Sequence, residues 1–420
     1  MSRKSKPAPH PSQKSFLVVA LVLSALVAGL ALTACGSSGG SSSTTAKPEG
    51  LSGKQADSYV DAQYSTEDRQ AAKVLAPEPD SFLAGKTTVT LLGSTTPANG
   101  DVNPYAIWPV TKTIGSVKAG DVLVGNFNNK SNDQGTGTTI VDVHPDHKTS
   151  VFAALPRQVQ GCPGGVGLTT AMVQLETGWV IVGSLPSRNG KTATAGQGCL
   201  LVLSPTGKLA RTISAPYLDG PWDAAVKDEG DTAQLFVSTV LNGIKGEAKS
   251  VVPKGTVVRL SLAQSKTSPP NVTAHTVVAG GFPERGDAAA FIKGPTGLAL
   301  GSSGTLYVAD VLGNRIDSIP EALTRESSAG TGTVLSAGGQ LANPLGLVIA
   351  PGGDILAANA TNGKIVEITP QGKQVGEYYA IQDVGQEPPG NGDLFDLAIN
   401  QAGNGVLFVN DDTNTLALLH

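Results

Sequence analysis

The chain has 420 residues, of which 52 are Gly and 27 are Pro, and its formal charge is −4. With 40% apolar and 15% charged residues it is not intrinsically disordered, and its glycine content excludes a coiled coil. No triplet period points to collagen, and the absence of a basic excess argues against a nucleic-acid partner.

Residues 1–34 have the features of a lipoprotein signal peptide. A basic stretch precedes an almost wholly apolar run over residues 16–32. The following Leu32-Thr33-Ala34-Cys35 resembles the bacterial lipobox, which implies cleavage before Cys35 and a diacylglycerol on its thiol. We therefore expect an exported protein held by lipid at the bacterial cell membrane or outer membrane. The alternative is an uncleaved anchor that ends in a free cysteine.

Residues 35–84 read as a tether with a partly ordered lead-in. Residues 36–50 are mostly Gly, Ser and Thr, a composition typical of a flexible coil. Ser65 is placed to cap a short helix over residues 65–75, which Pro77 and Pro79 would end.

Residues 85–420 contain six similar segments. Each has a β-branched or aromatic run that closes on a polar residue: Asn126, Ser184, Thr239, Asp310, Asn359 and Asp411. The runs recur at intervals of roughly 50 to 70 residues, close to one propeller blade with its loops.

Further strand-like runs accompany the β-rich run of each segment. An earlier phrase rich in small and aliphatic residues, such as residues 295–300 and 344–349, suits an inner strand beside a crowded axis. Third runs follow in most segments, and outer runs are visible at residues 209–214, 274–279 and 374–379. The pattern predicts an all-β, six-bladed β-propeller with four antiparallel strands per blade.

The last segment has three runs and then the chain stops. Residues 87–92 alternate and are rich in β-formers, so we predict that they supply the outer strand of the last blade. Such closure would remove exposed strand edges. The alternative is that residues 87–92 begin an ordinary first blade.

Two segments resemble the NHL repeat. Pro295-Thr-Gly-Leu-Ala-Leu300 continues into Tyr307-Val-Ala-Asp310 and then Asn314-Arg-Ile316, and residues 341–376 repeat the pattern with Asn359 in place of the Asp. The resemblance implies a six-bladed propeller related to the calcium-dependent lactonase and strictosidine-synthase-like group.

Cys162 and Cys199 are the remaining cysteines of a chain expected in an oxidising space. We predict a disulfide between them, against the alternative of two free thiols.

His144 and His147, flanked by Asp142 and Asp146, could be drawn as a metal pair. The Pro-Asp between them is more typical of a tight turn, so we predict no metal site there.

The candidate binding residues lie in the inner phrases. Asp223 and Asp396 occupy positions that are Gly297 and Gly346 elsewhere, so their carboxylates are candidates for ligand binding at the channel mouth. Beside them, an aromatic rim is expected from Trp222, Phe395, Tyr105 and Trp108. The alternative is that both aspartates bond backbone groups at the start of the strand.

The lactonase resemblance implies a calcium ion held by a Glu, two Asn and an Asp on different inner strands. Asp223 or Asp396 would take the Asp role, but residues 104–108 contain no Glu. We therefore assign no catalytic residues and expect no cofactor, with Ca²⁺ left open.

These observations favour a monomeric, lipid-anchored propeller that binds a protein, a glycan or a small ligand. The alternative is a metal-dependent hydrolase of the lactonase group, similar to gluconolactonases.

Overall fold

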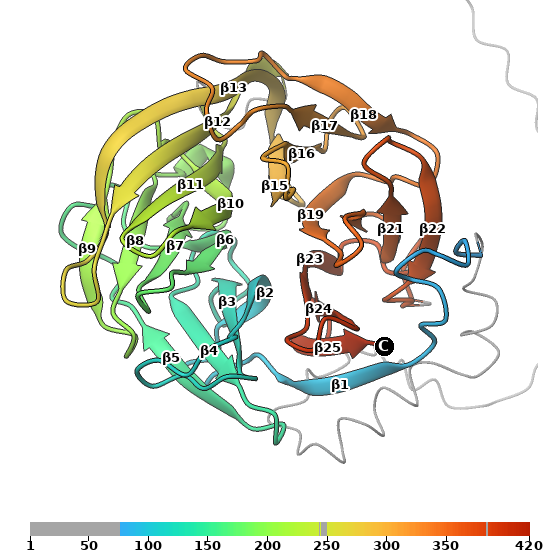
Figure 1. Cartoon of the computed structure of the whole chain (residues 1–420). Helices are drawn as coiled ribbons and strands as arrows, with labels where there is room; N and C mark the ends of the chain where they lie inside the picture. Colours follow the sequence, from blue (N-terminus) through green and yellow to red (C-terminus); the bar gives the residue numbers. More distant parts are fainter. Residues whose placement is uncertain (1–75, 243, 245–249, 384) are drawn as a thin grey trace, which may run out of the picture. The chain divides into compact units, whose positions relative to one another are not determined.

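The computed structural model describes residues 76–242, 244, 250–383 and 385–420. In this part of the chain the strands form six antiparallel sheets set around one axis (Figure 1). The described helical structure is a single 3-10 turn, η1 (Thr192–Thr194). The predicted all-β, six-bladed propeller is confirmed.

Each blade runs from an inner to an outer strand. Blade 1 contains β2 (Val102–Pro109), β3 (Val122–Asn128), β4 (Thr139–Val143) and β5 (Thr149–Ala154). Blade 2 contains β6 (Leu168–Gln174), β7 (Val180–Ser184), β8 (Cys199–Leu203) and β9 (Leu209–Ile213). Blade 3 contains β10 (Pro221–Asp228), β11 (Thr232–Thr239), β12 (Val252–Ala263), β13 (Asn271–Asp287) and β14 (Phe291–Lys293).

The second half of the ring is more regular. Blade 4 contains β15 (Pro295–Leu300), β16 (Leu306–Asp310), β17 (Arg315–Ile319) and β18 (Thr333–Ala337). Blade 5 contains β19 (Pro344–Ile349), β20 (Ile355–Asn359), β21 (Lys364–Ile368) and β22 (Gln374–Tyr379). Blade 6 contains β23 (Leu394–Ile399), β24 (Val406–Asn410), β25 (Thr415–Leu419) and β1 (Val89–Ser94).

Blade 6 is closed by both ends of the propeller sequence. β1 pairs antiparallel with β25, with Val89 opposite Leu419 and Ser94 opposite Thr415. Figure 1 shows β1 as the outermost strand beside the C-terminus. The predicted closing strand is confirmed, two residues later than the sequence pattern places it, and residues 87–92 do not begin blade 1.

The chain packs on the propeller before residue 85. Glu78 donates its backbone N–H to the carbonyl of Val375 at 2.8 Å. Phe82 and Leu83 donate theirs to the Glu367 carboxylate at 2.5 and 2.8 Å, and Leu83 is fully buried. The end of the expected tether is therefore part of the packed domain, against blade 5.

The expected signal peptide, Cys35 and the helix over residues 65–75 lie outside the described residues. Within the described ranges, no helix is long and apolar enough to cross a membrane.

The inner strands lie close together around the axis, which explains their small residues. A side chain at Gly297 would collide with the backbone of Leu345, and one at Gly346 would come within 2.6 Å of the Phe395 carbonyl oxygen. Each of the six inner strands also shows a register irregularity near its start. These irregularities leave inner-strand N–H groups available to other partners.

The predicted disulfide is confirmed. Cys162 and Cys199 are bonded with their Cα atoms 5.4 Å apart, and both are buried. The bond ties the loop before β6 to the start of β8 within blade 2.

Blade 3 departs most from the predicted pattern. Its outer strand β13 has 17 residues, far beyond the predicted residues 274–279, and turns back through β14. The extra hairpin explains much of the site described below.

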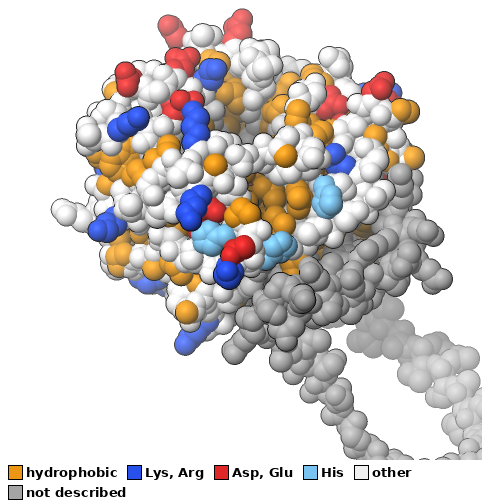
Figure 2. Space-filling view, turned by 60° about the horizontal axis from the view of Figure 1, so that its bottom comes forward, with side chains coloured by type: hydrophobic (Ala, Val, Ile, Leu, Met, Phe, Trp, Pro, Cys, Tyr) orange, Lys and Arg blue, Asp and Glu red, His pale blue; other side chains and the backbone are white. Residues whose placement is uncertain are grey.

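Charged side chains are dispersed over one face of the propeller. On the face drawn in Figure 2, Lys and Arg lie singly among Asp and Glu, without a concentrated basic patch.

Candidate functional site

Two cavities lie on the axis, one at each end of the inner strands. We call the edge where these strands begin the front face, and the edge where they end the back face. The front cavity has a volume of about 480 Å³ and the back cavity about 390 Å³. The gap between them, lined by Tyr105, Trp222, Asp223 and Phe395 among others, is too small for a water molecule.

Aromatic side chains form the floor of the front cavity. The rings of Tyr105 and Phe395 stack with centroids 4.2 Å apart, and Trp222 meets Tyr105 edge-on at 5.8 Å. Phe127 packs against both Tyr105 and Trp222 from the side. Because Tyr105 and Trp222 are 2% exposed and Phe395 is 7% exposed, they close the axis more than they form an open rim.

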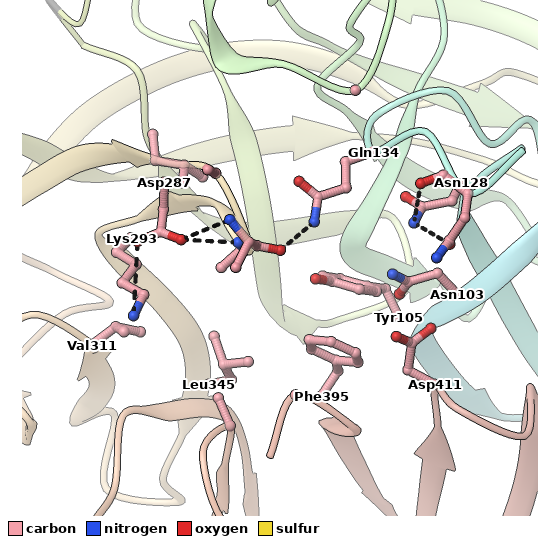
Figure 3. Close-up of a pocket in the computed structure, with 18 of the residues that line it drawn as sticks. Asn103, Tyr105, Asn128, Gln134, Asp287, Lys293, Val311, Leu345, Phe395 and Asp411 are labelled. Atoms are coloured by element: carbon pink, nitrogen blue, oxygen red, sulfur yellow. Dashed lines mark hydrogen bonds and ion pairs between the residues drawn. The ribbon is translucent and has the colours of Figure 1, made fainter. Parts of the chain in front are cut away.

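Loops from blades 1 to 3 build one wall of the front cavity. Gln134, in the β3–β4 loop, donates from its Nε2 to the Ala289 carbonyl in the β13–β14 hairpin at 2.5 Å (Figure 3). Asp287 holds this hairpin by accepting the backbone N–H groups of Ala289 and Ala290 and by pairing with Arg285 at 3.0 Å. Hydrogen bonds and an ion pair therefore hold this wall together.

Three side-chain amides on the front cavity have buried oxygens without a hydrogen-bond partner among the described residues. They are Asn103 Oδ1, Asn128 Oδ1 and Gln134 Oε1. Asn128 is oriented because its Nδ2 donates to Asn132 Oδ1 at 2.8 Å. Figure 3 shows Asn103 and Asn128 close to Tyr105, with Asp411 beside it. Buried acceptors without donors are costly, and a ligand in the cavity can donate to these oxygens only after the amides turn toward it.

The surroundings of Tyr105 favour its neutral, protonated form. Burial, and then the nearby charge of Asp411, raise the pKa of Tyr105 well above its ordinary value. Its hydroxyl therefore remains protonated at physiological pH.

The six residues predicted for one mouth are divided between the two cavities. Tyr105, Trp222 and Phe395 line the front cavity. Asp223, Asp396 and Trp108 line the back cavity instead. Trp222 and Asp223, like Phe395 and Asp396, lie in the irregular stretch near the start of their inner strand, where the first of the two lines the front cavity and the second the back cavity.

Asp223 and Asp396 bond the backbone of the next blade. Asp223 Oδ2 accepts the N–H of Leu298 at 2.8 Å, and Asp396 Oδ2 accepts that of Ile107 at 3.1 Å. Asp396 Oδ1 also accepts the N–H of Leu397 at 2.8 Å. Both aspartates therefore bond backbone groups, as the alternative interpretation of the sequence held, and the bonds to Leu298 and Ile107 cross to the next blade.

Both carboxyls are held near or in their neutral form. Burial raises the pKa of Asp223 to about 7. Burial, and then the charge of Asp223, raise the pKa of Asp396 well above its ordinary value.

The histidine pair separates in the structure. His147 and Asp146 lie in a tight turn after β4, where Asp146 pairs with Lys148 at 2.6 Å. His144 points instead toward Asp121 and Asp142, so part of the motif joins a cluster that spacing alone did not indicate.

Sequence reasoning missed Asn103, Asn128 and Gln134. Asn128 ends β3, two residues after the polar residue Asn126 that the repeat pattern identified, which was the available signal. Gln134 reaches the cavity only through its contact with the blade 3 hairpin, for which the sequence holds no signal we can name.

No protein-family model and no curated protein matches the sequence. Solved structures with a similar propeller include a gluconolactonase from Xanthomonas campestris, 13% identical, with 83% of this chain and 91% of that one covered and a TM-score of 0.48. A calcium-binding regucalcin from Agrobacterium tumefaciens is 12% identical over 78% and 93% of the chains, with a TM-score of 0.47. Virginiamycin B lyase from Staphylococcus aureus is 16% identical over 79% and 85%, with a TM-score of 0.45. These neighbours share the propeller fold.

Proposed function

We propose that the protein binds a small, hydroxyl-rich molecule, of sugar or sugar-lactone size, in the front cavity. The observation that carries the proposal is the set of three buried amide oxygens, on Asn103, Asn128 and Gln134, without protein donors. Hydroxyl groups of a ligand would supply those donors once the amides turn toward the cavity. A scaffold for a protein partner would not need a cavity of about 480 Å³.

The floor of the cavity supports the same class of ligand. Tyr105, Trp222 and Phe395 present apolar atoms beneath a polar rim that includes Lys191 and Asp133. Pockets with an apolar base and a few fixed polar groups favour ligands with one apolar and one polar side. A sugar ring, with C–H groups on one face and hydroxyls at its edge, has this character.

Hydrolysis of a bound lactone or ester is the second candidate. The amide oxygens of Asn103 and Asn128, with the carboxylate of Asp411, are hard oxygen donors of the kind that Ca²⁺ prefers. A bound Ca²⁺ would polarise a substrate carbonyl. The amides orient the ligand in either case, and the aromatic floor keeps water out from below.

Binding is tested by titrating the purified protein with a panel of monosaccharides, sugar acids and sugar lactones in a calorimeter. Asn128→Ala and Gln134→Ala should each weaken binding about 5- to 50-fold, since each removes one hydrogen bond to the ligand. Asn404→Ala, at an exposed turn on the back face, is the matched control and should bind normally. Equal binding by all variants would reject the site.

Hydrolysis is tested by acid release from the lactones with and without Ca²⁺. Calcium-dependent release that Asn128→Ala lowers would establish the second candidate. Binding without release would leave a binding protein.

Lipid anchoring through Cys35 remains a proposal of its own. Its support is the lipobox-like Leu32-Thr33-Ala34-Cys35 after an apolar run. The Cys35→Ser variant should lose the lipid mass and leave the membrane fraction. Unchanged fractionation and mass would reject the anchor.

A further inference from the structure

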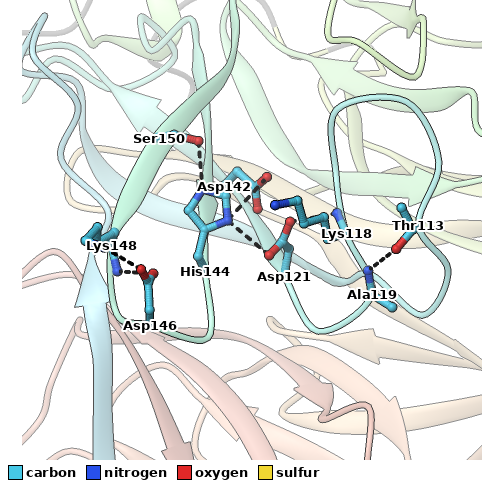
Figure 4. Close-up of polar contacts among 9 residues, drawn as sticks. All are labelled: Thr113, Lys118, Ala119, Asp121, Asp142, His144, Asp146, Lys148 and Ser150. Carbon is cyan, nitrogen blue, oxygen red and sulfur yellow. Dashed lines mark hydrogen bonds and ion pairs between the residues drawn. The ribbon is translucent and has the colours of Figure 1, made fainter.

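A second polar cluster lies at the back edge of blade 1, away from both cavities. Asp121 directly precedes β3, Asp142 lies in β4 and His144 follows β4. His144 Nδ1 is 3.0 Å from Asp121 Oδ1 and 3.9 Å from Asp142 Oδ2 (Figure 4). Ligand atoms from all three residues lie within 4.8 Å of one another.

Asp142 is buried without full hydrogen bonding. The residue is 3% exposed, and its Oδ1 has no hydrogen-bond partner among the described residues. Its neighbour across the cluster is another buried carboxyl, Asp121, which is 1% exposed. Two buried carboxyls side by side are costly unless a proton or a cation lies between them.

The surrounding groups orient the cluster. His144 Nε2 is 3.0 Å from Ser150 Oγ in β5, and Asp121 Oδ2 accepts the Lys118 N–H at 2.7 Å. These contacts leave His144 Nδ1 and Asp121 Oδ1 directed toward each other and toward Asp142. Such outer partners are typical of metal ligands, where they fix the ring and the carboxylate.

We propose that Asp121, Asp142 and His144 bind one Zn²⁺ ion at the back edge of blade 1. Tetrahedral ligands about 2.0 Å from zinc are roughly 3.3 Å apart, between the two distances from His144 Nδ1. Modest side-chain movement would therefore admit the ion. An imidazole nitrogen favours Zn²⁺ over the hard cation Ca²⁺.

The site would keep an open position. Three protein ligands leave a fourth for water, and the 29% exposed side chain of His144 gives access from solvent. The ion would bind Nδ1 of the neutral His144 tautomer whose proton is on Nε2, and that Nε2–H would donate to Ser150 Oγ. Lys118 is the nearby cation and opposes the ion, but two carboxylates outweigh its single charge.

The competing arrangement is an imidazolium that pairs with the two carboxyls and needs no metal. Zinc binding is measured on the full-length, tag-free chain after chelator treatment and dialysis, by metal analysis and calorimetry with Zn²⁺ alone. We expect one Zn²⁺ per chain at this site. Asp142→Asn and His144→Gln should each weaken it by more than roughly 100-fold, since loss of an outer partner alone costs 10- to 100-fold.

Two further variants sharpen the test. Ser150→Ala should weaken zinc binding by roughly 10-fold, as loss of an outer partner does. His147→Asn is the matched control, because Asn tolerates the left-handed backbone of His147 (φ 65°) and that side chain is outside the cluster. It should bind Zn²⁺ as the wild type does.

The proposal is overturned if the wild type binds no stoichiometric Zn²⁺, or if His144→Gln binds it equally well. Zinc-induced thermal stabilisation gives a second readout for variants that fold less well. It should be present in the wild type and in His147→Asn, and absent in His144→Gln.

Discussion

Replacing Asp223 by Asn should stabilise the propeller at alkaline pH. Asp223 is buried at the axis, where its Oδ2 accepts the Leu298 N–H. An Asn side chain keeps an oxygen for that bond and removes the charge. We expect the gain to depend on pH, because the cost that it removes is the cost of ionising a buried carboxyl.

The size of this stability difference follows from the pKa of Asp223. Burial raises the pKa of Asp223 to about 7, whereas an unfolded aspartate ionises near 3.9. Between these values the native state binds more protons than the unfolded state, so stability falls as pH rises and is constant above pH 7. The full loss corresponds to about 4 kcal/mol, and the part between pH 5 and pH 8 to about 3 kcal/mol.

Urea unfolding at pH 5 and pH 8 measures this difference. The advantage of Asp223→Asn over the wild type should grow by about 3 kcal/mol between the two pH values, and loss of the repulsion on Asp396 acts in the same direction. Asp80→Asn, at an exposed position, is the control and should show no such growth. An advantage that is equal at both pH values, or a variant less stable at pH 8, would refute the reasoning.

Three shorter predictions concern the packing of the domain. A chain that starts at Gly93 should aggregate, because β25 loses most of its partner strand; a folded monomer in size-exclusion chromatography would contradict the closure. The Cys162→Ser/Cys199→Ser variant should lose about 4 kcal/mol of unfolding free energy in urea, since the disulfide spans 37 residues; a loss under 1 kcal/mol would contradict this. Leu83→Ala should cost about 2–4 kcal/mol in the same assay, because Leu83 is fully buried, and an unchanged midpoint would place it outside the core.

The fold was predictable because its signal is repeated. Six copies of a β-rich phrase indicate blade number and strand order even where each copy is weak. The missing strand followed from counting, and β1 fills that place against β25. The cysteine pair was equally accessible, since Cys162 and Cys199 fall in one repeat.

The site was less predictable because it depends on which cavity each strand side chain faces and on the conformation of loops. The repeat pattern aligned Asp223 and Asp396 but did not show which end of the axis each carboxyl faces, and in the structure the aspartates and the three buried aromatic residues line different cavities. The hairpin that meets Gln134 is an irregular extension of one blade, which a repeat average conceals.

The cluster in blade 1 was also only partly predictable from the sequence. Asp142 and His144 were visible as neighbours, whereas Asp121 is 21 residues before Asp142 and reaches them only because β3 and β4 are paired, with Val122 opposite Val143. The local turn explained His147 correctly, but it could not reveal the third member of the cluster.

The central claim is that the front cavity binds a hydroxyl-rich small molecule through its unpaired amide oxygens. Calorimetric titration of the wild type and Asn128→Ala with the same sugar and sugar-lactone panel tests it most directly. We expect saturable one-site binding by the wild type and binding weakened about 5- to 50-fold by Asn128→Ala. No binding of any member of the panel, or equal binding by the variant, would contradict it.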